Sequence, residues 1–364
     1  MRGTVCALIV AGAFVAAPAV AATSFDRDAW GVFAKLTAPA GALKRNPVAF
    51  ETWASDADIY DGKAPVWPRR KVQVLVRSLA ASAEEIALHG TPPPAADCQP
   101  GTPYNFPPGA CFGEMVQHNW PVFKTIRDDG LYTQAGLAKA RTPIGFPGDS
   151  IVVKADWAAI PDLLRWLKAS YKTPDDVRRA YYTNIATLNG KTREYALLSM
   201  SVQSKSRPDW LWMTFEHRSN PGRCDDIGCH DDFGAMEANV APRALNSDYG
   251  PCAKTPALTA FLKSQHIDPV FANYCLKGTQ TAFVGPDGKA TKLANSVIER
   301  MNKGVPVEET SCITCHAYAS FDGGSGAPNY APLKWRPRPT GMPNSKLPDG
   351  FKTHDYLWSI LAAK

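Results

Sequence analysis

The amino-acid sequence predicts an α+β fold, in which an antiparallel sheet with peripheral helices is followed by a helical, loop-rich C-terminal lobe. Three observations predict this class. Apolar and polar residues alternate in several segments after residue 148, which is typical of half-buried strands. Asn189-Gly190 separates two such segments and is a strong β-hairpin signal. The 364 residues include 31 Pro and 27 Gly, which favours many turns and loops.

Regular structure is sparse in the first part of the chain. Pro-rich breakers occupy residues 91–94 and 106–109, and between residues 23 and 110 only 71–87 is expected to form a strand that runs into a helix. Residues 114–128 carry apolar side chains at helical spacing and predict a helix. Pro121 lies inside that helix, where it would introduce a kink.

Strands dominate the prediction for the second part. They are expected at residues 150–155, 180–188, 192–203 and 209–217, of which the second and third flank the Asn189-Gly190 turn. A small hairpin is predicted within residues 281–292, followed by a helix over 293–302. A closing helix is expected over 355–363.

The first residues have the features of a secretory signal peptide. Arg2 precedes an apolar run from residue 5 to 20, and Ala19-Val20-Ala21 fits a cleavage site. The run is short for the alternative, a retained membrane anchor. We therefore expect a periplasmic protein without a transmembrane segment in the mature chain. Its expected divisions are a signal peptide at 1–21, a mixed α/β region at 22–205 and a haem-site region at 206–364.

Composition narrows the class of protein. A chain that is 45% hydrophobic and 10% aromatic is not disordered throughout. The net charge of +6 is mild and the basic residues are dispersed, so nucleic-acid binding has little support. Of nine cysteines, Cys6 lies in the signal peptide, which leaves an even number in an oxidising compartment where disulfides persist.

One motif near the C-terminus carries most of the chemistry. Cys312, Cys315 and His316 form C-x-x-C-H, the attachment signature of c-type haem. Two thiols three residues apart can add to the two vinyl groups of one porphyrin edge, and the following His can bind iron. A redox dithiol would need a low-pKa cysteine in a βαβ context. A zinc site would need a second ligand pair at suitable spacing, and a disulfide across two residues would be strained.

Through these three residues the chain resembles the cytochrome c superfamily, loosely over residues 292–364. The resemblance implies one covalently attached haem c, with Cys312 and Cys315 as thioether anchors and His316 as proximal ligand. It also implies a periplasmic electron carrier that exchanges electrons with another periplasmic redox protein.

The sixth iron ligand has several candidates. Met342 lies in a Pro/Gly-rich loop downstream of the motif, where small cytochromes c supply a methionine, and a thioether would raise the reduction potential. His354 could be a ligand or could cap the last helix. His217 ends the alternating segment 209–217 and could reach a porphyrin, although such a histidine is more often structural. An open position would favour small-molecule chemistry.

A second cysteine cluster has two interpretations. Cys224, Cys229 and His230 form C-x4-C-H, a rare variant haem site, but Gly228 and the acidic residues before it also permit a tight turn closed by a disulfide. We expect the disulfide and regard a second haem there as the alternative. Proximity suggests that Cys98 pairs with Cys111 and Cys252 with Cys275.

Three function classes follow. The first is a monohaem c-type cytochrome that transfers single electrons. The second is a haem-dependent oxidoreductase, a peroxidase or small-molecule oxidase, whose substrate site lies in the large N-terminal region; the chain length favours it, because one haem does not need so many residues. The third is a non-haem exported binding protein with a dithiol at Cys312 and Cys315. The sequence names neither a redox partner nor a substrate, and no catalytic residue.

Overall fold

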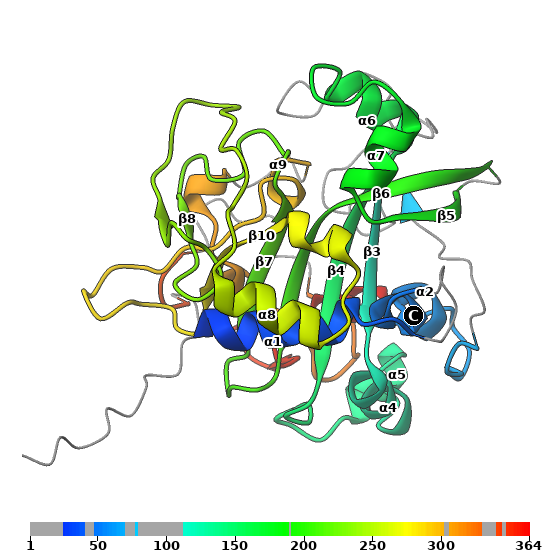
Figure 1. Ribbon diagram of the computed structural model, residues 1–364. Coiled ribbons are helices and arrows are strands. Elements are labelled where there is room, and N and C mark those ends of the chain that lie inside the picture. Colours follow the sequence, from blue (N-terminus) through cyan, green and yellow to red (C-terminus); the bar gives the residue numbers. More distant parts are fainter. Residues whose placement is uncertain are drawn as a thin grey trace, which may run out of the picture.

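An antiparallel sheet forms the centre of the computed structural model, which describes residues 25–40, 47–69, 77–78, 112–188, 191–301, 306–329, 340–343 and 347–364 (Figure 1). The main path of the sheet runs β1-β3-β4-β6-β7-β10, while β2 pairs with β3 and β5 pairs with β6. The strands of this sheet are β1 (Ala54–Ser55), β2 (Arg77–Ser78), β3 (Phe112–His118), β4 (Ile151–Ala159), β5 (Thr183–Leu188), β6 (Lys191–Ser204), β7 (Leu211–His217) and β10 (Tyr274–Gln280).

Two small strand pairs lie outside the central sheet. They are β8 (Cys229–His230) with β9 (Asn239–Val240), and β11 (Ser320–Asp322) with β12 (Phe351–Thr353). The central sheet takes strands from both sides of position 205, so the two expected regions share one sheet.

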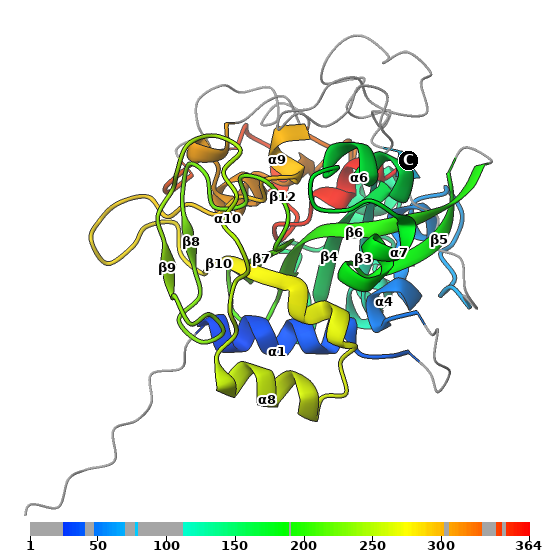
Figure 2. The same ribbon diagram turned by 45° about the horizontal axis from the view of Figure 1, so that its top comes forward.

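Short helices surround the sheet on both faces. The α-helices are α1 (Phe25–Thr37), α2 (Asp56–Ile59), α4 (Trp120–Asp128), α5 (Gln134–Lys139), α6 (Ile160–Trp166), α7 (Pro174–Ala180), α8 (Pro256–Ser264), α9 (Ile298–Met301) and α10 (Cys312–Ala317). The 3-10 helices are η1 (Ala49–Thr52), η2 (Pro269–Asn273), η3 (Val307–Glu309) and η4 (Trp358–Ala362). Figure 2 shows α1 and α8 side by side, away from the C-terminal segment. The fold is therefore α+β, as predicted.

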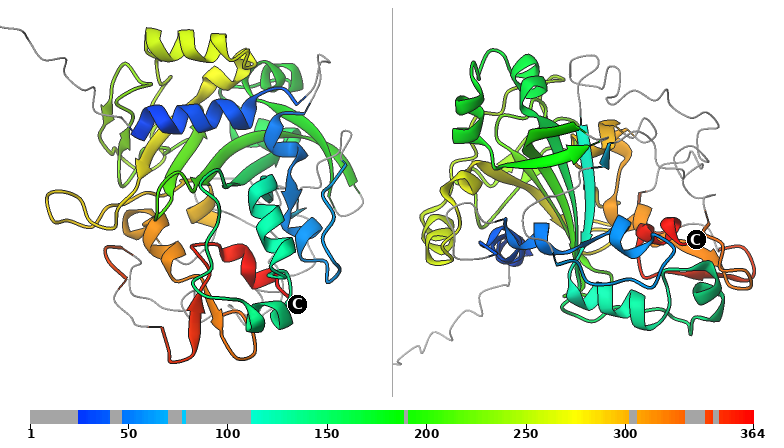
Figure 3. Two further views of the ribbon diagram at one scale, coloured as in Figure 1. Left: turned by 90° about the horizontal axis from the view of Figure 1, so that it is seen from below. Right: turned by 90° about the vertical axis from the view of Figure 1, so that its right-hand side faces the viewer.

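The two faces of the sheet bury different groups. On the face covered by α1 and α8, alternate residues of β7 enter a large apolar core that includes Leu211, Met213 and Phe215. Trp212 points to the opposite face and belongs to a second core with Ile313 of α10. Figure 3 shows this opposite face covered by α4, α5 and the C-terminal segment. The motif helix thus packs against the sheet.

The predicted strands of the second part are confirmed. The segment predicted at 150–155 begins one residue before β4 and otherwise lies within it. The segment predicted at 209–217 begins two residues before β7 and ends with it. The hairpin of β5 and β6 pairs Leu188 with Lys191 across the predicted two-residue turn, which itself lies outside the described residues. The hairpin expected within 281–292 is reduced to one bridge between Val284 and Ala290.

The helix predicted over 114–128 is wrong in its first part. Residues 112–118 form β3, which pairs with β4 along its whole length, and the helix begins at Trp120. Asn119 caps this helix, because its side chain accepts a hydrogen bond from the Val122 N–H. Pro121 consequently lies in the first turn, where its missing N–H costs nothing, and it does not kink the helix.

Two other predicted helices are shorter than expected. In the segment 293–302, α-helix begins only at Ile298, since Leu293 bridges to Ser311 and the Asn295 side chain accepts from the N–H groups of Val297 and Ile298. The closing segment 355–363 contains a 3-10 helix, Trp358–Ala362, instead of an α-helix.

Two predicted disulfides are present. Cys224 is bonded to Cys229, and Cys252 is bonded to Cys275. Gly228 has φ +76°, and a Cβ there would lie 2.8 Å from the Val240 carbonyl oxygen, so the tight turn needs glycine. The signal peptide at 1–21, the pair Cys98–Cys111 and most of the segment 71–87 lie outside the described residues. Among the described helices, none has the length and apolar character needed to cross a bilayer.

Candidate haem-attachment site

The C-x-x-C-H motif forms the six-residue helix α10, and its start is held by polar contacts to β10. Ser311 caps the helix by accepting from the Thr314 N–H. Gln280, the last residue of β10, accepts from the Ile313 N–H at 3.0 Å and donates to the Ser311 hydroxyl at 2.7 Å. One helical turn separates Cys312 from Cys315, so both thiols project from neighbouring positions of one helix.

Cys312 and Cys315 are the free cysteines of the described chain, and both are half-buried. The Cys312 thiol donates to the Leu293 carbonyl oxygen at 3.1 Å. Burial raises the pKa of Cys312 well above its usual value and raises that of Cys315 to about 12. Both groups are therefore neutral thiols at pH 7. A reactive redox dithiol would need the opposite shift.

The His316 imidazole is fixed in one tautomer. Its Nδ1 lies 2.8 Å from the Tyr356 carbonyl oxygen, which can only accept, so Nδ1 carries the proton and Nε2 carries a free lone pair. Burial lowers the pKa of His316 to about 4, which keeps the ring neutral at pH 7. The Trp212 ring lies 4.6 Å away, centroid to centroid. Metal-ligating histidines commonly have this arrangement, with the second nitrogen bonded to a carbonyl.

The C-terminal residues approach the same helix. The Thr314 hydroxyl donates to the Gly341 carbonyl oxygen at 2.7 Å, and the Trp358 indole N–H donates to the Cys315 carbonyl oxygen at 3.2 Å. The first contact brings the loop that carries Met342 next to the motif. The Met342 side chain is exposed, and the sulfur is not engaged in the described contacts.

The two histidines considered as further ligands differ in whether a ring nitrogen is available to bind a metal. His354 is fully buried, its Nδ1 lies 3.2 Å from the Leu357 carbonyl oxygen, and its Nε2 has no hydrogen-bond partner among the described residues. His217 has both nitrogens engaged: Nε2 donates to the Ala180 carbonyl oxygen and Nδ1 accepts from the Ser219 N–H. In this structure His217 is structural and offers no nitrogen to a metal.

Burial of His217 gives a testable pH dependence. Burial lowers its pKa from 6.5 to about 3, so the unfolded chain binds a proton below pH 6.5 that the folded chain does not. The stability conferred by this group is present above pH 6.5 and is lost as pH falls toward 3, with a slope of about 1.4 kcal/mol per pH unit. We expect His217→Gln to reduce the pH dependence of urea unfolding between pH 6 and 4 by about that slope. Equal slopes in the two proteins would contradict this.

A cluster of charged side chains that was not predicted from the sequence lies on the sheet face beside the motif. Lys154 and Glu114 form an ion pair at 2.8 Å, and burial raises the pKa of Asp156 well above its usual value. The negative charge of Glu299 also raises the pKa of each motif thiol, by an effect second only to that of burial. Lys277 opposes this effect at Cys312, and Lys154 opposes it at Cys315. The signal in the sequence was the alternation of Lys154 and Asp156 with apolar residues in one strand.

The second cysteine cluster is closed. Because the sulfurs of Cys224 and Cys229 are joined, this C-x4-C-H segment offers no free thiol for a second haem. The Arg223 guanidinium donates to the Cys224 sulfur at 3.1 Å and ties the disulfide to the loop that contains Gly250. The expectation of a disulfide here is confirmed.

Comparison of the chain with family models, with curated proteins and with solved structures found no match. The resemblance to cytochromes c therefore rests on Cys312, Cys315 and His316 in the sequence alone. Cys312 and Cys315 are free thiols, and His316 is a neutral imidazole. These properties are the physical basis for a functional assignment.

Proposed function

We propose that the protein is an exported c-type cytochrome that binds one haem c covalently and transfers single electrons. Cys312 and Cys315 would hold the haem through thioether bonds, and His316 would bind its iron through Nε2. The observation that carries the proposal is the fixed tautomer of His316, which follows two unpaired thiols on one helical turn. Bound haem supplies a ferric/ferrous couple for one-electron exchange.

The residues of this chain would tune that couple in definable ways. The hydrogen bond from His316 Nδ1 to the Tyr356 carbonyl orients the ring and increases its basicity as a ligand. Trp212 packs against the imidazole and helps to hold the ring in place. Burial of the motif against the sheet favours a neutral imidazole over imidazolium, so no proton has to leave before iron is bound.

Met342 is the proposed sixth ligand, because the Thr314–Gly341 hydrogen bond brings its loop beside the motif helix. We expect Met342→Ala to abolish the thioether-to-iron charge-transfer band of the ferric protein. The reduction potential should fall by on the order of 100 mV, a fraction of the ~0.8 V span that axial ligands control. The matched variant Met236→Ala removes another exposed methionine and should change neither property. A band that survives Met342→Ala would exclude this ligand.

A periplasmic location and a redox-protein partner belong to the same proposal. The N-terminal segment supports export, and the two disulfides are suited to an oxidising compartment. A potentiometric titration tests electron transfer directly. A single one-electron wave, with full recovery of the oxidised spectrum, is the expected result, whereas a protein that cannot be cycled would reject an electron carrier.

A haem oxidoreductase is the second candidate, and the charged cluster around Lys154 and Glu299 favours it, since such groups could move protons near a haem. Steady-state oxidation of a dye by hydrogen peroxide would distinguish the two. Turnover that falls tenfold or more in Glu299→Gln, at unchanged haem content, would favour the enzyme. Absence of turnover would favour the carrier.

A further inference from the structure

A second cluster of possible metal ligands lies on the part of the molecule built from α1, β8 and the segment after β8. Asp26 is the second residue of α1, while His230 and Asp232 lie at the end of β8 and just beyond it. One ligand atom from each of these three residues lies within 4.8 Å of the other two. The Nε2 atom of His230 is 3.5 Å from an Asp26 carboxylate oxygen. None of these residues takes part in the haem-attachment site.

This spacing suits a small divalent metal ion. Zinc binds histidine nitrogen and carboxylate oxygen at about 2.0–2.2 Å, so two ligands of a tetrahedral site lie about 3.4 Å apart. The 3.5 Å between His230 Nε2 and Asp26 Oδ2 therefore needs almost no adjustment. The Asp232 side chain is exposed, and its ligand oxygen lies within 4.8 Å of the ligand atoms of Asp26 and His230.

His230 is oriented for metal binding by a residue outside the cluster. Its Nδ1 lies 2.8 Å from the Asn239 side-chain oxygen, across the β8–β9 pair in which the two residues are register partners. An amide oxygen can only accept, so Nδ1 carries the proton and the lone pair of Nε2 is free on the Asp26 side. This is the outer-shell arrangement of ligating histidines.

Asp26 is buried and, among the described residues, forms no ion pair with a lysine or arginine. It is 2% exposed, and its carboxylate accepts from the Thr279 hydroxyl at 2.7 Å and from the Asp232 N–H at 2.9 Å. The group beside its Oδ2 is the unprotonated Nε2 of His230, at 3.5 Å, which supplies no positive charge. A bound cation would compensate a carboxylate that the fold already holds in place.

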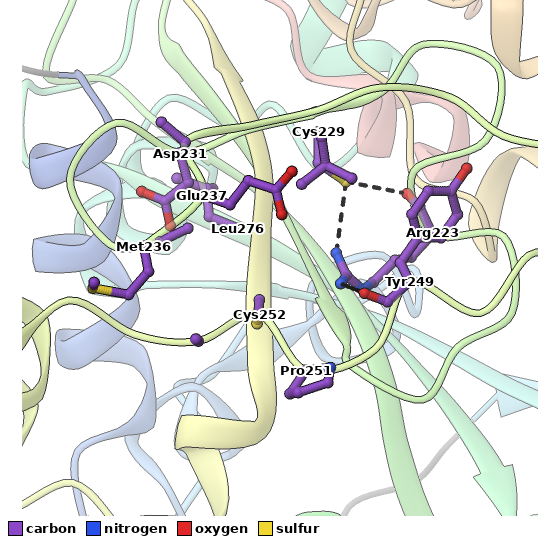
Figure 4. Close-up of a pocket in the computed structure, with 13 residues that line it drawn as sticks. Arg223, Cys229, Asp231, Met236, Glu237, Tyr249, Pro251, Cys252 and Leu276 are labelled. Atoms are coloured by element: carbon purple, nitrogen blue, oxygen red, sulfur yellow. Dashed lines mark hydrogen bonds between the residues drawn. The ribbon is translucent and has the colours of Figure 1, made fainter.

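We propose that Asp26, His230 and Asp232 bind a divalent transition metal, with zinc as the best fit, and leave at least one coordination position open to solvent. The His230 side chain is 52% exposed, so an ion can reach the site. A nitrogen ligand and only two carboxylates disfavour calcium, which takes six to eight oxygens. A separate pocket of about 310 Å³ has Asp231 and Glu237 among its lining residues, and none of the three proposed ligands lines it (Figure 4).

Asp231 itself is committed to the fold and is not a proposed ligand. Its carboxylate accepts from the Trp30 indole at 2.9 Å and from the Gly234 N–H at 2.6 Å. Glu237 is exposed and lines the same pocket, so it offers a charge-matched control.

Calorimetric titration of the full-length mature protein with zinc chloride tests the proposal. We expect His230→Gln and Asp232→Asn each to weaken one zinc site at least tenfold, and Asn239→Ala to weaken it about 10- to 100-fold through loss of orientation. Glu237→Gln should leave the affinity within twofold. All four substitutions are at exposed positions, so folding should be preserved; zinc bound at Cys312, Cys315 or His316 would persist in every variant.

Two results would overturn the zinc site. One is a wild-type protein whose zinc binding is unaffected by His230→Gln and Asp232→Asn. The other is calcium binding at least as tight as zinc binding and insensitive to His230→Gln, which would mark a plain acidic patch.

Discussion

Replacing both Cys312 and Cys315 with alanine is expected to abolish covalent haem attachment, while leaving the sheet and both disulfides intact. The two thiols make few contacts that the fold needs, since Cys312 donates one hydrogen bond and neither sulfur is bonded to another. Haem that survives denaturing electrophoresis, detected by its peroxidase stain, measures the effect. The stain should disappear completely in the double variant and persist, reduced, in either single variant.

Thr314→Ser is the matched control for this experiment. It lies between the two cysteines, and serine preserves the hydroxyl that donates to the Gly341 carbonyl. Its haem stain should equal that of the wild type. Haem that stays attached under denaturing conditions in the double cysteine variant would place the attachment elsewhere and reject the proposed site.

Replacing Phe215 with alanine is expected to produce the largest loss of stability. Its side chain is fully buried in the middle of β7, and its ring lies 4.5 Å from Phe33 and 5.1 Å from Trp30, centroid to centroid. Truncation leaves a cavity between the sheet and α1, which costs about 3–5 kcal/mol in the free energy of unfolding. Urea denaturation followed by circular dichroism measures it.

Phe215→Leu tests whether the cavity causes this loss. Leucine keeps most of the apolar volume, so the cost should fall to about 1–2 kcal/mol. A Phe215→Ala variant within about 1 kcal/mol of the wild type would show that α1 does not pack on β7 as described here.

Local signals predicted the elements that local physics determines. Asn189-Gly190 specifies a tight hairpin whatever lies around it, and β5 and β6 pair across it. Gly228 allows the turn that closes Cys224 on Cys229. Residues 114–118 were predicted as helix from their spacing but belong to β3, because β3 pairs with β4, a segment more than thirty residues away. The residue spacing within one segment does not indicate which distant segment it will pair with.

In the candidate site, too, some residues can be identified from the local sequence and others only from the fold. Cys312, Cys315 and His316 are adjacent in sequence and could be singled out from it, whereas the groups that orient them come from distant segments. Tyr356 supplies the carbonyl for His316, and Gln280 holds the start of the motif helix. The zinc cluster joins Asp26 to residues about 200 positions later, so only the fold could bring its members together.

The haem content of the purified, exported protein tests the central claim most directly. A pyridine haemochrome spectrum, combined with the protein concentration, gives the number of covalently attached haems per chain. We predict one haem, with the absorption of two thioether links. A value of zero would contradict the proposed function, and a value of two would contradict the disulfide between Cys224 and Cys229.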